Sequence, residues 1–135
     1  MIALEHWARQ SRRGRVLIND AGLITEREPD TVRGVDVAYF SYQRLPMSQM
    51  PSGFTDVPPP VAVEVVGKGP GWKKMVEKAG EYRRMGVDRV WIVDPKKKRV
   101  CIFRPDDGPE ISINPRQSAI LPCCTAFDAA REFFL

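Results

Sequence analysis

In the first half of the chain, short polar stretches separate apolar runs that have the residue composition of β-strands. Three strand-like runs stand there: VLI at 16–18, AGLITERE at 21–28 and VRGVDVAYFS at 32–41. The turn-like pair Pro29 and Asp30 separates the last two runs, so an antiparallel meander is expected. Before the meander, Leu4 and Trp7 lie at helical spacing, which predicts a short helix over residues 4–11.

The second half combines strands with one well-marked helix. VAVEVV at 61–66 is an apolar strand interrupted only by Glu64. The segment 72–85 carries apolar residues at i, i+3, i+4 and i+7, and Gly86 fits a helix C-terminus. Two further strands are expected at 87–94 and 100–104, joined by a turn at DPKKK.

The order strand, helix, strand favours a right-handed crossover, in which the strands at 61–66 and 90–94 run parallel. Together these elements predict an α/β (α+β) fold, with a mixed β-sheet flanked by helices. A length of 135 residues favours a single domain, 1–135. Within it we expect an N-terminal helical arm at 1–13, an irregular loop at 41–60 and a short terminal helix that opens at Thr125.

Composition limits the classes of protein and of metal site. Hydrophobic residues make up 43% of the chain and charged residues 28%, which is within the range of soluble globular proteins. No apolar run approaches the roughly 18 to 20 residues of a membrane span, and the N-terminus does not have the pattern of a secretory signal. We therefore expect a cytoplasmic protein without a membrane partner. One histidine and three cysteines without a CxxC pair favour hard oxygen ligands over a zinc site.

Two acids, Asp36 and Glu64, each interrupt an apolar strand. A buried carboxylate is costly unless a positive group lies against it, and a divalent cation is the simplest such group. If the two strands are neighbours, both carboxylates and the backbone carbonyl of Val65 converge on one place. These oxygens suit Mg²⁺ or Mn²⁺, which activates a water and stabilises charge on a phosphoryl oxygen. For Asp36 taken alone, an ion pair or an exposed edge position is the alternative.

Three further residues extend this hypothesis. Lys78 falls on the shoulder of the apolar face of the 72–85 helix, so it is expected to reach inward. There it would position the nucleophile or neutralise the developing charge. Tyr82 lies one helical turn beyond Lys78, where it either belongs to the core or orients that lysine. Glu28 is a further candidate for the acidic cluster, since the direction of its side chain is open.

The order of these segments also resembles a known family. GVDVAYFS, a proline-rich gap, VAVEVV and then KAGEYRRMGVDRVWIVDPKKKRVCIFR are similar to the Uma family of restriction-endonuclease-like proteins, within the PD-(D/E)xK nuclease superfamily. The similarity runs from about residue 14 onward and is most specific between Lys78 and Pro95. It implies a restriction-endonuclease-like core, with Asp36 as the aspartate of the PD element and Glu64 as the following acid.

The resemblance also implies where the catalytic lysine stands. The simplest superfamily motif places it two residues after the glutamate, where this chain has Val66. The family pattern displaces the lysine onto the following helix and so indicates Lys78, with Lys68 on the intervening turn as the competing candidate. Val35 stands in place of the PD proline, and Gly67-Lys68-Gly69 replaces the usual serine-containing turn. These departures affect the geometry of the turn that the resemblance places next to the metal.

The function implied is that of a metal-dependent DNA endonuclease, which hydrolyses phosphodiester bonds with a magnesium-activated water. The net charge of +4 suits a phosphate-bearing partner. Two basic segments are predicted to contact backbone phosphates: Arg12, Arg13 and Arg15, and Lys96, Lys97 and Lys98. For the second segment, a solvated turn without a nucleic-acid contact is the alternative. Analogy with the superfamily also suggests a homodimer.

Two other functions stay open. The first is a catalytically inactive nucleic-acid-binding or protein-interaction module on the nuclease scaffold, which Val66 and Gly67 in place of motif residues favour. The second is a structural subunit that dimerises through apolar surface near the C-terminal phenylalanines Phe127, Phe133 and Phe134. Binding that is indifferent to metal would indicate the first, and loss of self-association on removal of 125–135 would indicate the second.

Overall fold

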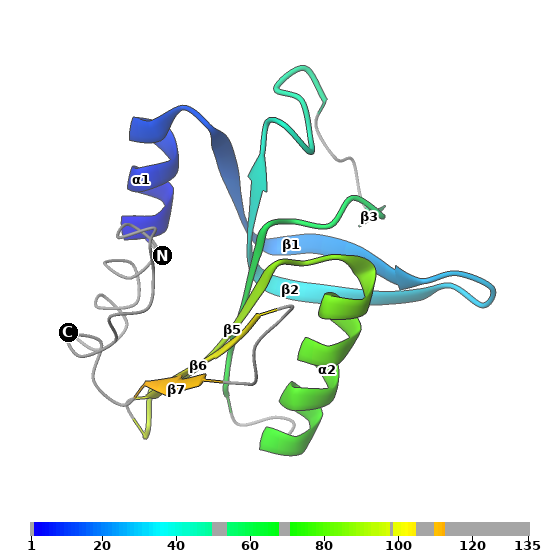
Figure 1. The fold of residues 1–135 in the computed structure, drawn as a ribbon, viewed down its shortest axis with the longest axis vertical. Coiled ribbons are helices and arrows are strands. Elements are labelled where there is room, and N and C mark those ends of the chain that lie inside the picture. The colour runs from blue at the N-terminus through cyan, green and yellow to red at the C-terminus, as the bar shows by residue number, and fades with distance from the viewer. Residues whose placement is uncertain (1, 50–53, 68–70, 98, 105–109, 113–135) are drawn as a thin grey trace.

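The computed structural model describes residues 2–49, 54–67, 71–97, 99–104 and 110–112. Within them the chain forms two helices and seven strands (Figure 1). In chain order these are α1 (Ile2–Ser11), β1 (Gly14–Glu26), β2 (Thr31–Ser41), β3 (Phe54–Thr55), β4 (Val61–Val65), α2 (Trp72–Met85), β5 (Arg89–Asp94), β6 (Arg99–Phe103) and β7 (Glu110–Ser112).

The described strands belong to one mixed sheet, in the order β3-β1-β2-β4-β5-β6-β7. β1 pairs antiparallel with β2, and β2 with β4. β4 and β5 are parallel, with Val61 opposite Arg89 and Val65 opposite Val93, and α2 forms the crossover between them. β5, β6 and β7 continue antiparallel. The predicted α+β fold with a mixed sheet is therefore confirmed.

The N-terminal strands are fewer and longer than the sequence pattern predicts. The runs at 16–18 and 21–28 contribute to one strand, β1, which keeps pairing with β2 across an irregularity between Ile18 and Ala21. The polar residues Asn19 and Asp20 separate the two apolar runs at that point. The backbone absorbs one extra residue as a β-bulge, because a turn there would give up the ladder on both sides.

The segment expected to be an irregular loop, 41–60, contains a short strand. Phe54 and Thr55 form β3, which pairs parallel with Gly22 and Leu23 of β1. Gly22 permits this close approach, because a Cβ at that position would overlap the ring of Phe54. A strand of two residues is too short to show a period, so the sequence pattern does not reveal it.

The sheet separates two apolar clusters. On one face, Met75 and Ala79 of α2 pack in a cluster with Ile92. On the other face, Ala8 of α1 lies in a cluster with Trp91. The predicted helix over 4–11 is thus present within α1, and burial of Ala8 fixes it against the sheet. Figure 1 shows the two helices well apart, with the sheet between them.

Several sequence-based predictions concern parts of the chain outside the described residues. They are the terminal helix that opens at Thr125, the C-terminal phenylalanines, Lys68 and Lys98. Among the helices that the structure describes, none is long and apolar enough to cross a membrane.

Candidate active site

Asp36 and Glu64 lie on neighbouring strands. The pairing of β2 with β4 joins Val37 to Val63, and one further step along the two strands places Asp36 opposite Glu64. Asp36 Oδ2 also accepts a hydrogen bond from the backbone N–H of Val65, at 2.8 Å. The structure thus brings the two predicted acids together near the carboxyl end of β4.

Glu64 is a buried acid with two donors on one oxygen, and only 2% of the residue is exposed. Tyr82 Oη donates to Oε1 at 2.6 Å, and Lys78 Nζ lies 2.9 Å from the same oxygen. Burial raises the pKa of the carboxyl group, the hydrogen bonds from Tyr82 and Lys78 oppose that rise, and the nearby charge of Asp36 adds to it. A carboxylate this deep needs such partners to remain ionised.

α2 positions Lys78 and Tyr82 together because residues four apart lie on the same face of a helix. The helix begins after Gly71 and ends at Gly86, whose φ of 109° is left-handed and suits glycine. Tyr82 is fully buried, and burial raises the pKa of its hydroxyl. The Lys78 side chain is 25% exposed and reaches inward from the shoulder of the apolar face. Tyr82 therefore belongs to the core and to the site at once.

A backbone carbonyl on β2 anchors both of these side chains. Lys78 Nζ donates to the carbonyl oxygen of Gly34 at 3.0 Å, and Tyr82 Oη lies 3.5 Å from the same oxygen. Gly34 comes two residues before Asp36, so neighbouring positions of β2 hold the lysine and carry the first acid. The sequence offers no signal for this acceptor, because every residue type supplies a carbonyl.

The oxygen donors at this place suit a divalent cation. Among the described residues, Asp36 Oδ1 and Glu64 Oε2 have no hydrogen bond, so each carboxylate keeps one oxygen for a ligand. The N–H of Val65 is directed at Asp36, and in a strand the carbonyl of a residue lies on the same side as its N–H. The Val65 carbonyl is therefore on the side of β4 that faces Asp36.

Two carboxylates, one carbonyl and water form a set that Mg²⁺ or Mn²⁺ accepts, because such ions keep several waters. A site made only of protein side chains would need more ligands than these two acids. Within the described part of the chain, no group of three or more His, Cys, Asp or Glu is placed to hold a metal. The donor set present thus fits a hydrated cation at two acids.

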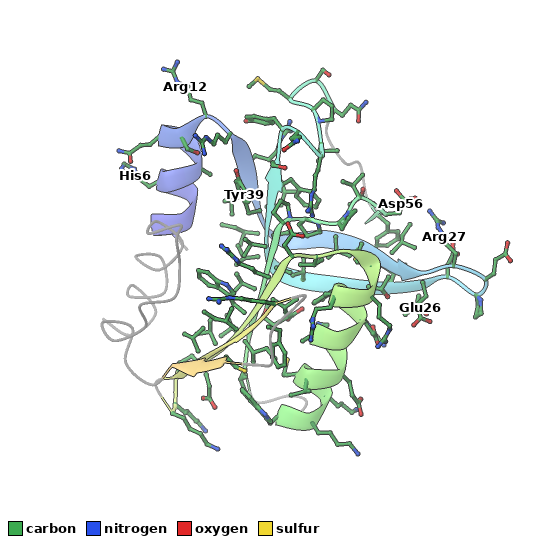
Figure 2. The ribbon with its side chains drawn as sticks, viewed as in Figure 1. His6, Arg12, Glu26, Arg27, Tyr39 and Asp56 are labelled. Carbon is green, nitrogen blue, oxygen red and sulfur yellow. The ribbon has the colours of Figure 1, made fainter. Side chains whose placement is uncertain are left out.

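Two other sequence candidates lie away from this cluster. Val66, where the simplest motif has its lysine, packs against the apolar cluster beside α2, so this position is part of the core. Glu28 lies in the exposed turn between β1 and β2, and the structure does not bring it to the acids. The reason is the length of the hairpin. Figure 2 shows the adjacent Arg27 at its far tip, well beyond the core of the sheet.

The two predicted basic segments lie at opposite ends of the sheet. Lys96 and Lys97 are in the turn that follows β5. Because β5 runs parallel to β4, this turn lies at the same end of the sheet as Glu64. The start of β1 instead pairs with Ser41, at the far end of β2. That second end carries the cluster predicted from the N-terminal segment: Arg12, Arg13 and Arg15.

An ion pair beside the site was not predicted from the sequence. Arg33 of β2 donates two hydrogen bonds to Glu81 of α2, from Nε at 2.6 Å and from Nη2 at 2.8 Å. The hydrogen bond lowers the pKa of Glu81 and raises that of Arg33. Both residues line a pocket of about 490 Å³ that Lys78 also lines. The pair therefore fastens α2 to β2 next to the acids.

Comparisons with known proteins concern the family and the fold of the chain. Residues 1–130 match the family model Uma2, described as "Putative restriction endonuclease". The fold is similar to the crystal structure of "a putative nuclease belonging to DUF820" from Anabaena variabilis, with a TM-score of 0.77 and 15% sequence identity. That similarity covers 99% of this chain and 76% of the other. No curated protein matches the chain. The family match supports a nuclease-like function, and the structural match shows the fold.

Proposed function

Since the chain belongs to the Uma2 family, we propose that it is a metal-dependent DNA endonuclease that hydrolyses phosphodiester bonds. The observation that carries the proposal is the convergence of Asp36, Glu64 and Lys78 near the carboxyl end of β4. A buried acid, Glu64, beside a partly buried acid, Asp36, and with a lysine against it combines metal ligands and a cation in one place. This is the chemistry that attack on a phosphodiester requires.

Mg²⁺ or Mn²⁺ would be held by Asp36, Glu64 and the carbonyl of Val65, and when bound it supplies an acidified water and positive charge beside a phosphoryl oxygen. The chain itself fixes the ligands. The Val65 N–H orients the Asp36 carboxylate, and Tyr82 Oη orients the Glu64 carboxylate from the core. Held in this way, the acids meet the cation without rearrangement, as a preorganised site requires.

Lys78 acts as a point cation in this proposal. Its ammonium group is held between Gly34 O and Glu64 Oε1, so its position is set by the same two strands that carry the acids. From there it would orient the attacking water or neutralise charge that develops on the phosphate. Lys68, the competing candidate, would take this role if Lys78 proved dispensable.

The turn after β5 is the proposed contact for the DNA backbone. Lys96 and Lys97 are exposed there, at the same end of the sheet as Glu64, and Lys98 follows them in sequence. Replacement of Lys96 and Lys97 by glutamate should weaken DNA binding and flatten its salt dependence, because each phosphate contact contributes about −0.9 to the slope of log K against log salt. An unchanged slope would mean that this turn is only solvated.

The deciding experiment is cleavage of supercoiled plasmid with Mg²⁺, with Mn²⁺ and with a chelator. Glu64→Gln keeps the size of the side chain and its acceptor for Tyr82 but removes the charge that binds metal. Glu26→Gln, on the exposed hairpin, is the matched control. We expect metal-dependent nicking by the wild type and by the control, and none by Glu64→Gln. Nicking by a well-folded Glu64→Gln protein at the wild-type rate would refute the site.

The alternative is a nucleic-acid-binding module that has lost catalysis. It is favoured by one observation, namely that Glu64 Oε1 accepts a hydrogen bond from Tyr82 and lies 2.9 Å from the Lys78 ammonium group, so the protein itself balances the charge of this acid. This alternative predicts DNA binding that is unaffected by metal, by the chelator and by Glu64→Gln, together with no nicking by the wild type. Association as a homodimer is a separate proposal, and sedimentation of the protein with and without duplex DNA tests it directly.

A further inference from the structure

A second basic site lies at the junction of α1 and β1, at the end of the sheet opposite the acids. A pocket of about 410 Å³ opens there, and its lining includes Arg9, Arg12, Arg15 and Tyr42. None of the described residues that line it is acidic. Several arginines around one cavity give it a positive lining, and such a lining attracts an anion. The pocket therefore has the electrostatic character of an anion site.

Arg15 is fixed in this pocket before any ligand arrives. Its Nη2 donates to the carbonyl oxygens of Met47 at 2.9 Å and Pro46 at 3.3 Å. Its guanidinium group lies 5.3 Å from the centre of the Tyr42 ring, within the range of a cation–π contact. These contacts hold the positive charge in place, so little side-chain freedom is lost when an anion binds.

Arg12 occupies a backbone position at which arginine is unusual. Its φ is 54°, in the left-handed region, and its N–H closes α1 through a 3.1 Å bond to the carbonyl of Ala8. Glycine is the common residue at such a helix end, because a side chain is disfavoured there. The Arg12 side chain is exposed and lines the pocket, so helix termination does not explain the choice of residue. A role of the Arg12 side chain in binding explains why arginine stands at this position.

We propose that this pocket binds a backbone phosphate of the nucleic acid, at a place separate from the acids and with Arg12 as the principal contact. The identity of the ligand rests on the proposed function. Ser41, which pairs with the start of β1, is five residues from Asp36 along β2, or about 17 Å. Along the axis of a DNA duplex, where each base pair rises by about 3.4 Å, that distance corresponds to about five base pairs. The pocket thus supplies an anchor remote from the point of cleavage.

The test is the binding of a fluorescein-labelled duplex of about 20 base pairs, followed by anisotropy over a range of salt concentrations and always with chelator present. Arg12→Gly is the informative variant, since glycine suits the left-handed backbone and the fold should be as stable as the wild type or more so. We expect about a tenfold loss of affinity and a salt slope reduced by about 1. Arg27→Gln removes the same charge at the hairpin tip and should bind as the wild type does.

Wild-type affinity and salt slope in a folded Arg12→Gly protein would overturn the proposal. It would also fail if inorganic phosphate alone raised the melting temperature of the wild type but not of Arg12→Gly, while both bound duplex equally. The pocket would then accept only a small anion. Because chelator prevents metal-dependent cleavage, this measurement does not depend on catalysis. A wild type that never nicks plasmid would refute the endonuclease and leave the phosphate pocket standing.

Discussion

Tyr82 Oη donates a 2.6 Å hydrogen bond to Glu64 Oε1, from a side chain that is fully buried in the core. The tyrosine projects from α2 into the same apolar cluster as Ala79, and the glutamate projects from β4 toward it. A hydrogen bond between a core residue and a buried acid joins the packing of the domain to the geometry of its site. If the acid turned away, the hydroxyl would lose this short bond and keep only the Gly34 carbonyl, 3.5 Å away.

Tyr82→Phe should therefore weaken both stability and activity. The ring and its packing remain, while Glu64 loses its shortest hydrogen bond. We expect the free energy of unfolding to fall by about 1 to 2 kcal/mol, as for the loss of one partner of a hydrogen bond to a charged group. Urea denaturation measures this directly. Plasmid nicking should need more Mg²⁺ for the same rate, because Glu64 is no longer held in place.

The matched control for that variant is a double-mutant cycle with Glu64→Gln. If Tyr82 acts through Glu64, the stability losses of the two single variants should not add, and the coupling should exceed about 0.5 kcal/mol. Additive losses, with an unchanged metal requirement in Tyr82→Phe, would show that the hydroxyl serves only the core.

Metal binding should be visible as added stability, independently of cleavage. A ligand that binds only the folded state stabilises it by RT ln(1 + [L]/Kd), which is about 1.4 kcal/mol at ten times Kd. Millimolar Mg²⁺ or Mn²⁺ should therefore raise the melting temperature of the wild type by several degrees. Glu64→Gln and Asp36→Asn each remove one ligand and should lose the shift, whereas Glu26→Gln should keep it. An equal shift in all four proteins would place the metal elsewhere.

Lys78→Met should slow cleavage strongly while leaving metal binding in place. The methionine keeps most of the apolar stem of the side chain but removes the ammonium group that lies 2.9 Å from Glu64. A rate loss of about 100-fold or more is expected, the usual size for a preorganised group that stabilises charge in the transition state. Single-turnover nicking at saturating Mg²⁺ measures it. Lys73→Met, on an exposed position of the same helix, is the control. Undiminished cleavage by Lys78→Met would contradict the role of Lys78 and favour Lys68 as the catalytic lysine.

The elements with a clear local period were predictable from the sequence. The apolar spacing over 72–85 and Gly86 gave the bounds of α2, and the same helical geometry placed Lys78 on an inward shoulder. The apolar run at 61–66 gave β4 within one residue. The opposition of Asp36 and Glu64 followed once the two strands were assumed to be neighbours, because strand register is set by which face is buried.

Features that depend on distant partners were not predictable in this way. Arg33 and Glu81 are 48 residues apart and meet only because α2 crosses over β2. The Gly34 carbonyl has no residue-specific signature, and β3 is too short to show a period. Glu28 was an open candidate because a hairpin of that length cannot be measured from turn residues alone. In each case the missing information is the tertiary arrangement of the strands.

The Arg33–Glu81 pair should contribute stability that disappears in acid. Because Arg33 lowers the pKa of Glu81 below the ordinary 4.5, the ionised form is favoured in the folded state. Stability from this pair is therefore fully present above about pH 4.5 and is lost as the pH falls through the lower folded-state value. The Arg33 side chain is 42% exposed, so solvent screening limits the contribution to about 1 kcal/mol.

Glu81→Gln measures that contribution against a neutral isostere of the same size. Its free energy of unfolding should be about 1 kcal/mol below the wild-type value at pH 7, and the two should converge as the pH falls toward 3. Added salt should reduce the gap at pH 7. Glu26→Gln, whose partner Arg84 lies 3.9 Å away on the exposed surface, should change stability by less than about 0.5 kcal/mol. If the Glu81→Gln deficit were the same at pH 3 and pH 7, the side chain would act by packing, and the charge on Glu81 would not be what fastens α2 to β2.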